Sequence, residues 1–196
     1  MKCGYCYNPE IVFGKGQLSF SELFSFLQKR IGLIDAVVFS GGECLLHKDI
    51  IEVVRRVKKM GFLVKIDTNG SKPAVLQELI TKKLIDYVAL DFKAMPAHFE
   101  KITQSNFFLP FQKSVRMLIE SGLSFEVRTT IHSDLIDGNQ LRQMIHYLEK
   151  QNYLGNYYVQ HFMNGANTLE PLGYSTKEIE RENFSTSNIK VHFRGK

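Results

Sequence analysis

The sequence has no tryptophan, and its 196 residues include only three cysteines and five prolines. Three cysteines are too few for a disulfide scaffold, so we expect reduced thiols. No apolar run approaches the roughly 20 residues that a membrane-spanning helix needs. A charged and apolar leader typical of secreted proteins is also absent. These features favour a cytoplasmic protein with no membrane association.

Linker-like and low-complexity stretches are absent too, so we expect a single domain that spans residues 1–196. The hydrophobic fraction of 44% and the charged fraction of 23% are typical of globular proteins. The formal net charge is +5. Basic residues in the segment 55–59 lie among apolar residues at helical spacing, which predicts a solvent-exposed helix face rather than a nucleic-acid site.

Helical and strand-like patterns alternate along the whole chain. Strand-like runs occupy 36–40, 62–66, 87–90, 125–131, 157–162 and 189–193, and helical patterns occupy 20–31, 50–57, 73–80, 110–119 and 141–147. Regular strand–helix units favour a parallel sheet with right-handed crossovers. The pattern therefore predicts an α/β fold built on a parallel sheet.

Several polar residues that can take part in catalysis or binding lie at or near the ends of these expected strands. They are Glu43, Asp67, Asp91, Lys93, Arg128 and His161. In a (β/α) barrel, the carboxyl ends of the strands form the face that carries the active site. Each residue taken alone is also compatible with an ordinary polar loop. Their common position at five successive strand ends favours a functional site.

The chain begins with two thiols that a single metal centre can share. Cys3 and Cys6 are three positions apart, with Tyr5 between them and an Asn-Pro turn directly after them. Thiolates are the ligands that iron–sulfur clusters and zinc prefer. Farther along, Gly41 and Gly42 end a strand, and glycine lets the backbone approach a ligand without an intervening Cβ. We therefore expect a metal-binding loop and a ligand-binding edge.

These segments resemble, in order, motifs of the radical S-adenosylmethionine (SAM) superfamily. Residues 3–9 (CGYCYNP) resemble the second half of its CxxxCxxC signature, and residues 40–43 (SGGE) resemble its GGE motif. Residues 67–70, 90–93 and 160–165 are similar to segments of proteins that activate glycyl radical enzymes. Residues 126–132 (EVRTTIH) resemble the branch that activates anaerobic ribonucleoside-triphosphate reductase. The resemblance covers residues 2 to about 171 and implies that the α/β fold is a partial (β/α)₆ barrel of the TIM type.

The resemblance implies a 4Fe–4S cluster and S-adenosylmethionine as cofactors. Cys3 and Cys6 would be two of the three cluster ligands. The expected cofactor contacts are Tyr5 and His161 near the adenosyl group, Gly41, Gly42 and Glu43 at the methionyl ammonium, Asp67, Asp91 and Lys93 at the methionyl and ribose parts, and Arg128 at the methionyl carboxylate. Simple packing remains the alternative for Tyr5 and His161. Cys44 is expected to be a small buried thiol rather than a ligand.

The implied reaction is the formation of a 5′-deoxyadenosyl radical, which would remove a hydrogen atom from a backbone glycine of a partner enzyme. The resemblance favours anaerobic ribonucleotide reductase as this glycyl radical enzyme. Pyruvate formate-lyase or another glycyl radical enzyme remains an alternative partner. An electron donor such as flavodoxin or ferredoxin would reduce the cluster, and the basic net charge would help an acidic donor to approach.

The sequence differs from the family signature CxxxCxxC at the first cysteine. The third cysteine of CxxxCxxC would fall two residues upstream of Met1, and the first barrel strand would precede it. We therefore expect an N-terminally truncated barrel with an unpaired sheet edge. Two other interpretations stay open: an inactive folded remnant without a cluster, and a zinc or dithiol module that uses Cys3 and Cys6.

Overall fold

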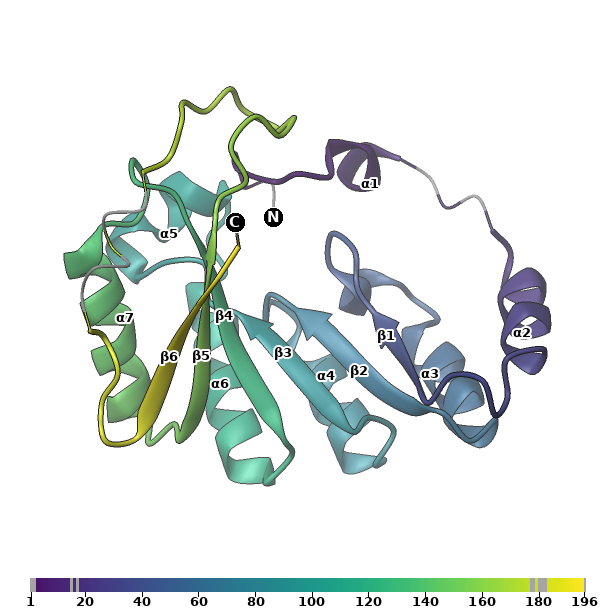
Figure 1. Ribbon diagram of the computed structural model, residues 1–196. Helices are drawn as coiled ribbons and strands as arrows, with labels where there is room; N and C mark the ends of the chain where they lie inside the picture. The colour runs from purple at the N-terminus through teal and green to yellow at the C-terminus, as the bar shows by residue number, and fades with distance from the viewer. Residues whose placement is uncertain (1–2, 15, 17, 177–178, 180–182, 196) are drawn as a thin grey trace.

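The structure is a computed structural model that describes residues 3–14, 16, 18–176, 179 and 183–195 (Figure 1). Its strands are β1 (Ala36–Phe39), β2 (Leu63–Thr68), β3 (Tyr87–Asp91), β4 (Phe125–Ile131), β5 (Gly155–His161) and β6 (Ile189–Arg194). Its helices are α1 (Pro9–Phe13), α2 (Phe20–Gln28), α3 (Ile50–Lys59), α4 (Pro73–Thr81), α5 (Pro96–Thr103), α6 (Phe108–Ser121) and α7 (Gly138–Lys150), with a 3₁₀ turn, η1, at Cys44–Leu46.

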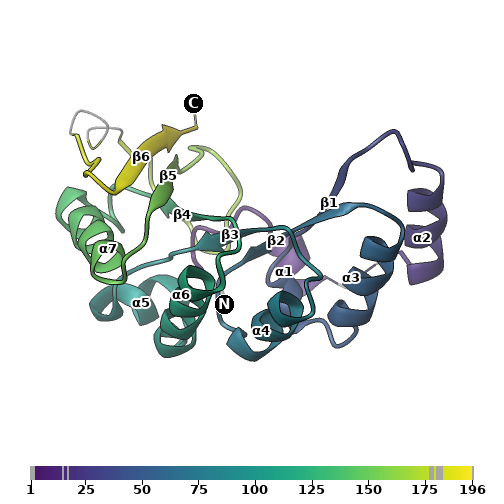
Figure 2. The ribbon, with the colours of Figure 1, turned by 90° about the horizontal axis from the view of Figure 1, so that it is seen from below.

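The six strands form one curved sheet in the order β1-β2-β3-β4-β5-β6, and every neighbouring pair is parallel. Helices α3, α4, α6 and α7 lie against one face of this sheet (Figure 2). All strands therefore point their carboxyl ends to the same edge, and the N-terminal segment with α1 crosses above that edge (Figure 1). The expected partial (β/α)₆ barrel is confirmed, and the late strand β6 is part of its sheet.

Local sequence signals explain where several helices begin. Ser19 caps α2 through a capping box with Glu22, and Asp137 forms a second capping box with Gln140 at the start of α7. Helix α3 buries its apolar side and carries its basic residues outward, as the segment 55–59 predicted. One of these basic residues, Arg56, places its guanidinium 3.8 Å from the ring centroid of Phe24 and so joins α3 to α2.

Three helices, α1, α5 and α6, differ from the sequence expectation. Helix α5 was not expected, although Pro96 occupies its first turn, where a proline is tolerated because the first N–H groups of a helix have no intrahelical partner. Helix α6 begins at Phe108 and not at Pro110, because Pro110 also fits within a first turn. Short helices carry too few turns to show a clear apolar period, so α1 and α5 escaped the pattern.

The two faces of the sheet differ sharply in chemistry. Alternate strand residues such as Ile66, Leu90 and Val127 are fully buried beneath the helices and form the core. The opposite side, called the polar face below, is the side from which Lys65, Asp67, Tyr87, Asp91, Glu126 and Arg128 project, as the ion pairs and hydrogen bonds among them show. A polar face at a strand edge suits a binding site better than a core.

Strand β1 is the outermost strand on its side of the described sheet. Val38 of β1 and Leu63 of β2 are each 52% exposed, which is high for apolar residues in a sheet. Among the described residues β1 therefore has no partner on its outer side, as expected, and Val38 and Leu63 expose apolar surface on the polar face. Among the described helices, none combines the length and the apolarity that crossing a bilayer requires.

Candidate functional site

The expected strand-end residues converge because parallel pairing places them in register. Asp91 of β3 lies directly beside Arg128 of β4, and Asp67 of β2 lies one strand away, beside Ala89. Glu43 follows β1 in the adjoining loop, at the start of η1. The carboxyl edge of the sheet therefore carries the cluster of charges that the sequence predicted.

Arg128 lies between two carboxylates at this edge. Its Nη1 donates to Oδ2 of Asp67 at 3.1 Å, and its Nε donates to Oδ1 of Asp91 at 3.0 Å. The Nη2 atom is also 3.0 Å from Asp91 Oδ1. Three of the five guanidinium donors are thus engaged within the chain, which leaves two for a ligand. Arg128 holds the ends of β2, β3 and β4 together as well as contributing positive charge.

Lys93 extends the same network toward the N-terminal segment. Its Nζ donates to Asp91 Oδ2 at 3.2 Å and lies 5.7 Å from the ring centroid of Tyr5. Burial by itself lowers the pKa of Lys93, but the charge of Asp91 and the nearby Tyr5 outweigh it and hold that pKa above its ordinary value. Lys93 is therefore a permanently charged ammonium at the base of the site.

Glu43 is bound mainly by its own chain. Its Oε1 accepts hydrogen bonds from Leu45 N at 3.1 Å and from Thr68 Oγ1 at 2.9 Å. Its Oε2 accepts one from Asn69 N at 2.7 Å. Burial raises the pKa of Glu43, and these hydrogen bonds oppose the rise. Because a carboxylate offers about four lone-pair positions, about one remains for a ligand cation.

The loop with Cys3 and Cys6 turns tightly beside this network. The amide of Cys6 donates to the carbonyl of Cys3 at 3.0 Å, and Tyr5 between them is 5% exposed. Burial raises the pKa of the Cys3 thiol, while the nearby Lys93 charge opposes the rise. A metal ion that binds here would remove the proton, because a coordinating thiol is deprotonated outright.

The segment that follows β5 contacts this loop at several points, which the sequence analysis did not predict. The hydroxyl of Tyr7 accepts a hydrogen bond from Met163 N at 2.8 Å, and its ring packs on Phe162 at 5.4 Å. The amide of Glu170 donates to the carbonyl of Gly4 at 3.0 Å. A Cβ on Gly4 would lie 2.6 Å from Oε2 of Glu170, so a larger residue here would require the Glu170 side chain to move.

A cavity of about 150 Å³ lies between the cysteine loop and the strand ends. Its lining residues are Cys3, Tyr5, Cys6, Tyr7, Asn8, Val12, Gly41, Gly42, Asn69, Asp91, Lys93 and Thr130. It therefore brings together seven predicted site residues: both cysteines, Tyr5, both glycines, Asp91 and Lys93. The other charged residues are linked to this lining by hydrogen bonds: Glu43 accepts from Asn69, and Arg128 donates to Asp91 and to Asp67.

His161 is placed differently from the other predicted residues. It ends β5 with the same orientation as the buried Tyr157 and Val159, and its ring stacks on Phe193 of β6 at 5.6 Å. It is not among the residues that line the cavity. Cys44 is half-buried, as expected of a packing thiol, and its Sγ donates to the carbonyl of Asp67 at 3.4 Å.

Gly70 anchors the turn after β2 that presents Asn69 to the cavity. Its φ is +72°, and a Cβ there would lie 3.0 Å from Leu90, 3.2 Å from Phe111 and 3.3 Å from Ser114. Its carbonyl also accepts a hydrogen bond from Ser114 Oγ at 2.8 Å. Both the backbone conformation and the surroundings therefore favour glycine.

The Gly70→Ala substitution is expected to lower the free energy of unfolding by about 2–4 kcal/mol, because it combines left-handed strain with overpacking. Gly61→Ala is the matched control. Gly61 has φ +92°, but a Cβ added there would meet no atom within 4 Å. It should lose only the strain, about 1–2 kcal/mol. Urea unfolding of both variants tests this, and equal losses would contradict the packing contribution.

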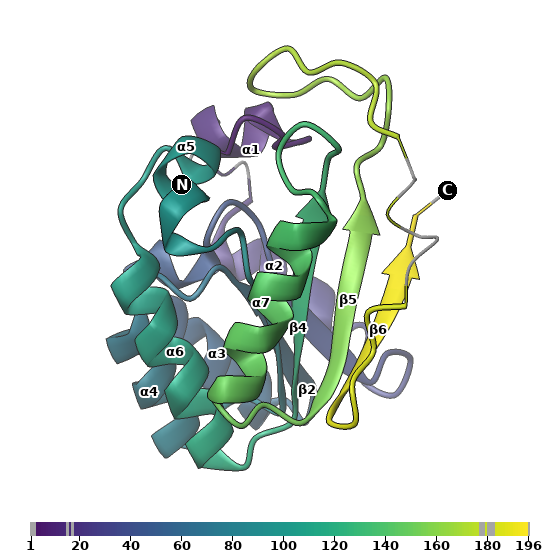
Figure 3. The ribbon, with the colours of Figure 1, turned by 90° about the vertical axis from the view of Figure 1, so that its left-hand side faces the viewer.

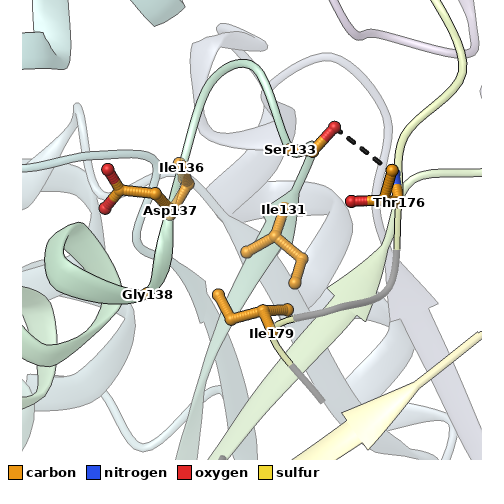
Figure 4. Close-up of a pocket in the computed structure, with 7 residues that line it drawn as sticks. All are labelled: Ile131, Ser133, Ile136, Asp137, Gly138, Thr176 and Ile179. Atoms are coloured by element: carbon orange, nitrogen blue, oxygen red, sulfur yellow. Dashed lines mark hydrogen bonds between the residues drawn. The ribbon is translucent and has the colours of Figure 1, made fainter. Parts of the chain in front are cut away.

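A second cavity, of about 210 Å³, lies between the end of β4, the start of α7 and the chain that follows β5 (Figure 4). It is lined by Ile131, Ser133, Ile136, Asp137, Gly138, Thr176 and Ile179. Thr176 N donates to Ser133 Oγ at 3.3 Å across it, and Asp137 is engaged in capping α7. It contains no predicted site residue.

The first cavity brings together two of the thiols that an iron–sulfur cluster uses and several polar groups that suit an organic cofactor. Cys3 and Cys6 supply two thiol ligands, although the described residues contain no group of three or more His, Cys, Asp or Glu side chains that could hold a metal ion. A Cβ on Gly42 would meet no atom within 4 Å, and one on Gly41 would meet only Ile11 at 3.9 Å. The glycine edge is therefore open to a ligand.

Comparison with known proteins identifies the family of the chain. The Radical SAM superfamily pattern matches residues 1–150. A Methanocaldococcus jannaschii protein named as a glycyl-radical enzyme activating enzyme is 48% identical over 95 residues, which are 47% of this chain and 39% of that protein. The chain spans about two fifths of the length of the curated relatives that it matches first, 39% and 41%.

Solved structures share the fold. SuiB of Streptococcus suis, bound to S-adenosylmethionine, aligns with a TM-score of 0.71 at 15% identity over 99% of this chain and 47% of that one. A domain of the pyruvate-formate lyase-activating enzyme of Bacteroides vulgatus aligns with a TM-score of 0.66 at 15% identity over 83% of this chain and all 100% of that one. From its sequence match and its fold, the chain belongs to the radical SAM superfamily.

Proposed function

We propose that the protein is a radical SAM enzyme that installs a glycyl radical on a partner enzyme, and that anaerobic ribonucleoside-triphosphate reductase is this partner. The single observation that carries the proposal is the cavity that brings Cys3 and Cys6 against the glycine edge, Asp91 and Lys93. The relative with 48% identity, named as a glycyl-radical enzyme activating enzyme, supports the class of reaction. The similarity of residues 126–132 to the reductase-activating branch supports the partner.

The cluster and S-adenosylmethionine, when bound, supply the one-electron chemistry, and the chain supplies binding, orientation and exclusion of water. We assign Cys3 and Cys6 as cluster ligands. Gly41 and Gly42 would let the cofactor approach the backbone. Tyr5 is buried between the two thiols, where it limits access of water to the ligand loop.

The charged residues would bind the polar parts of S-adenosylmethionine. Glu43 has about one lone-pair position left for the methionyl ammonium. Arg128 has two donors left for the methionyl carboxylate, and Asp67 and Asp91 hold its guanidinium in place. Asp91 and Lys93 border the cavity and would contact the ribose.

His161 needs a displacement to take part in binding. Its side chain is buried on the helix side of β5 and stacks on Phe193. We keep the adenosyl group as its proposed ligand, and a change of the ring's position on cofactor binding would be visible in its proton chemical shifts.

The electron that starts the reaction would come from an acidic donor such as flavodoxin or ferredoxin. The formal net charge of +5 favours encounter with a donor of negative charge. The long-range part of this attraction is screened within a Debye length of about 8 Å at physiological ionic strength. The rate of cluster reduction by flavodoxin should therefore fall as salt is added.

The partner assignment is tested by electron paramagnetic resonance. Iron-reconstituted protein is incubated without oxygen with S-adenosylmethionine, dithionite and either anaerobic ribonucleotide reductase or pyruvate formate-lyase. We expect a glycyl-radical doublet on the reductase that collapses when its glycines carry deuterium at Cα. A doublet only on pyruvate formate-lyase would move the assignment to that partner. Cleavage of S-adenosylmethionine with no radical on either enzyme would contradict the proposed class of reaction.

A further inference from the structure

Strand β6 carries a row of basic side chains on the polar face. Its burial alternates: Ile189 is fully buried and Val191 and Phe193 are half-buried in the core, whereas Lys190, His192 and Arg194 are exposed. Consecutive members of this set are two residues apart, so each is separated from the next by about 6.6–6.8 Å along the strand. We call Lys190, His192 and Arg194 the basic row.

Strand β5 holds the basic row in place without carboxylates. Tyr158 lies opposite His192 in the sheet, and their rings stack with centroids 5.2 Å apart. The guanidinium carbon of Arg194 lies 3.3 Å from the centroid of the Tyr158 ring. His192 Nε2 is also 2.9 Å from Asn156 Oδ1. Stacking and an amide contact fix the positions of His192 and Arg194, and the charges of Lys190 and Arg194 stay available for a ligand.

The acidic residues of the polar face are already engaged by other cations. Asp67 and Asp91 pair with Arg128, and Glu126 lies 3.7 Å from Lys65 Nζ. Lys190, His192 and Arg194 form no ion pair with another described residue. The polar face is thus balanced at β2 to β4 and has an excess of positive charge at β6.

The basic row lies on the strand that borders the open side of the sheet. Strand β6 is the outermost strand on its side, and its position at the margin is visible in Figure 3. The strand pairs with β5 from Gly155 to Gln160, so the row runs toward the carboxyl edge where the cavity lies. A segment that enters the polar face from this margin therefore passes the basic row before it reaches the cavity.

We infer that the basic row is a docking surface for an extended acidic segment of the partner protein, the segment that leads to its target glycine. The inference rests on the proposed function for the identity of the partner. Side chains of an extended chain that point to one side repeat every two residues, at the spacing of the basic row. Glutamate or aspartate at alternate positions would therefore meet Lys190, His192 and Arg194 in turn.

A nucleic acid fits this surface less well than an acidic peptide. Sequence-independent binding of single strands uses aromatic rings on which bases stack. The ring of Tyr158, which is the aromatic platform of the row, is already in contact with Arg194 and His192. The basic row would therefore recognise its partner by charge complementarity along an extended acidic chain.

The test measures binding of a short fluorescein-labelled peptide with glutamate at alternate positions on both sides of a central glycine. We expect fluorescence anisotropy to detect binding by the full chain and the affinity to fall with added salt. The double variant Lys190→Glu/Arg194→Glu should weaken binding by roughly tenfold or more, because like charges then face each other. The same variant should bind a peptide with lysine in place of glutamate more tightly than the unaltered chain does.

The matched control is Lys113→Glu/Arg116→Glu, which makes the same change of charge on exposed positions of α6, on the helix side of the sheet. It should leave peptide affinity within about twofold, since only the screened net charge changes. Equal loss in both double variants, or no loss in the β6 variant, would overturn the inference. Displacement of the peptide by a thymidine oligonucleotide at lower concentration would also overturn it and assign the row to nucleic acid.

Peptide binding needs neither cluster nor S-adenosylmethionine, so it is measured separately from the proposed reaction. If the row binds the acidic peptide and no glycyl radical forms on either enzyme, the docking surface stands and the proposed function fails. If radical transfer proceeds at the same rate in the β6 double variant, the proposed function stands and the inference fails.

Discussion

Replacing Cys3 and Cys6 together with serine is expected to abolish iron retention after anaerobic reconstitution. Both thiols border the cavity beside Lys93, and thiolates are the ligands that iron–sulfur clusters use. Loss of a ligand should reduce metal affinity by more than the roughly 10- to 100-fold that loss of an outer hydrogen-bond partner costs. Iron analysis and the visible absorption of the reconstituted protein measure this effect.

Cys44→Ser is the matched control for these thiols. Burial, and after it the charges of Glu43 and Asp67, raise the pKa of Cys44 to about 12, so this sulfur stays a thiol at neutral pH. Thiols bind metals poorly compared with thiolates. We expect this variant to keep its iron. Loss of iron in Cys44→Ser, with retention in the double variant, would place the metal at η1 and contradict the assigned ligands.

The second large effect is expected from Arg128→Met. The guanidinium lies between Asp67 and Asp91, and its side chain is 15% exposed. Removing one partner of a buried ion pair leaves uncompensated charge, and here two carboxylates would face each other. The free energy of unfolding should fall by about 3 kcal/mol. Denaturant unfolding at neutral pH, without cofactors, measures the change.

Two further variants separate charge from packing at this position. Arg128→Lys keeps the positive charge but cannot donate to both carboxylates from fixed positions, so it should lose less stability than Arg128→Met. Adding Asp67→Asn to Arg128→Met should recover part of the loss, because it removes one of the repelling charges. An Arg128→Met loss below about 0.5 kcal/mol, the range of ordinary surface substitutions, would contradict the bridging role.

The sequence was sufficient to predict the convergence of Asp67, Asp91 and Arg128. Asp67 and Asp91 lie at the ends of apolar strand patterns, Arg128 lies within the next one, and parallel strands bring their carboxyl ends to one edge. Which of them would pair was not predictable, because the pairing depends on the relative register of β2, β3 and β4. The register places Asp91 beside Arg128, and the long guanidinium reaches Asp67 one strand farther away.

The alternation of apolar and polar residues along β5 indicates which face of the sheet His161 occupies, whereas its position at a strand end does not. Tyr157, Val159 and His161 share one parity, and the first two are apolar enough to indicate the core side. This parity would have placed His161 with the core and Tyr158 on the polar face. The structure has this arrangement, with Tyr158 beneath Arg194.

The contacts between the cysteine loop and the segment that follows β5 could not have been predicted from local patterns. Tyr7 contacts Met163 across 156 positions of sequence, and Gly4 contacts Glu170 in the same segment. No periodicity links residues so far apart, and the segment 162–176 has no regular secondary structure. Only the glycine between the two cysteines is a local sign, because a Cβ there would meet the Glu170 side chain.

Two other interpretations of the cysteine pair predict different metal contents. A structural zinc site takes four protein ligands, and the described residues near Cys3 and Cys6 provide no third His, Cys, Asp or Glu ligand. Stoichiometric zinc in protein purified without oxygen would nevertheless favour the zinc or dithiol module. A protein that stays colourless after reconstitution would favour a folded remnant.

Cleavage of S-adenosylmethionine is the measurement that tests the central claim most directly, namely that the strand-end cavity holds an iron–sulfur cluster against this nucleotide. Reconstituted protein is mixed with S-adenosylmethionine and dithionite without oxygen, and the products are separated by chromatography. We expect methionine and 5′-deoxyadenosine in equal amounts from the unaltered chain and from Cys44→Ser, and none from Cys3→Ser/Cys6→Ser. Iron-loaded protein that leaves S-adenosylmethionine intact, or equal cleavage by the double variant, would contradict the claim.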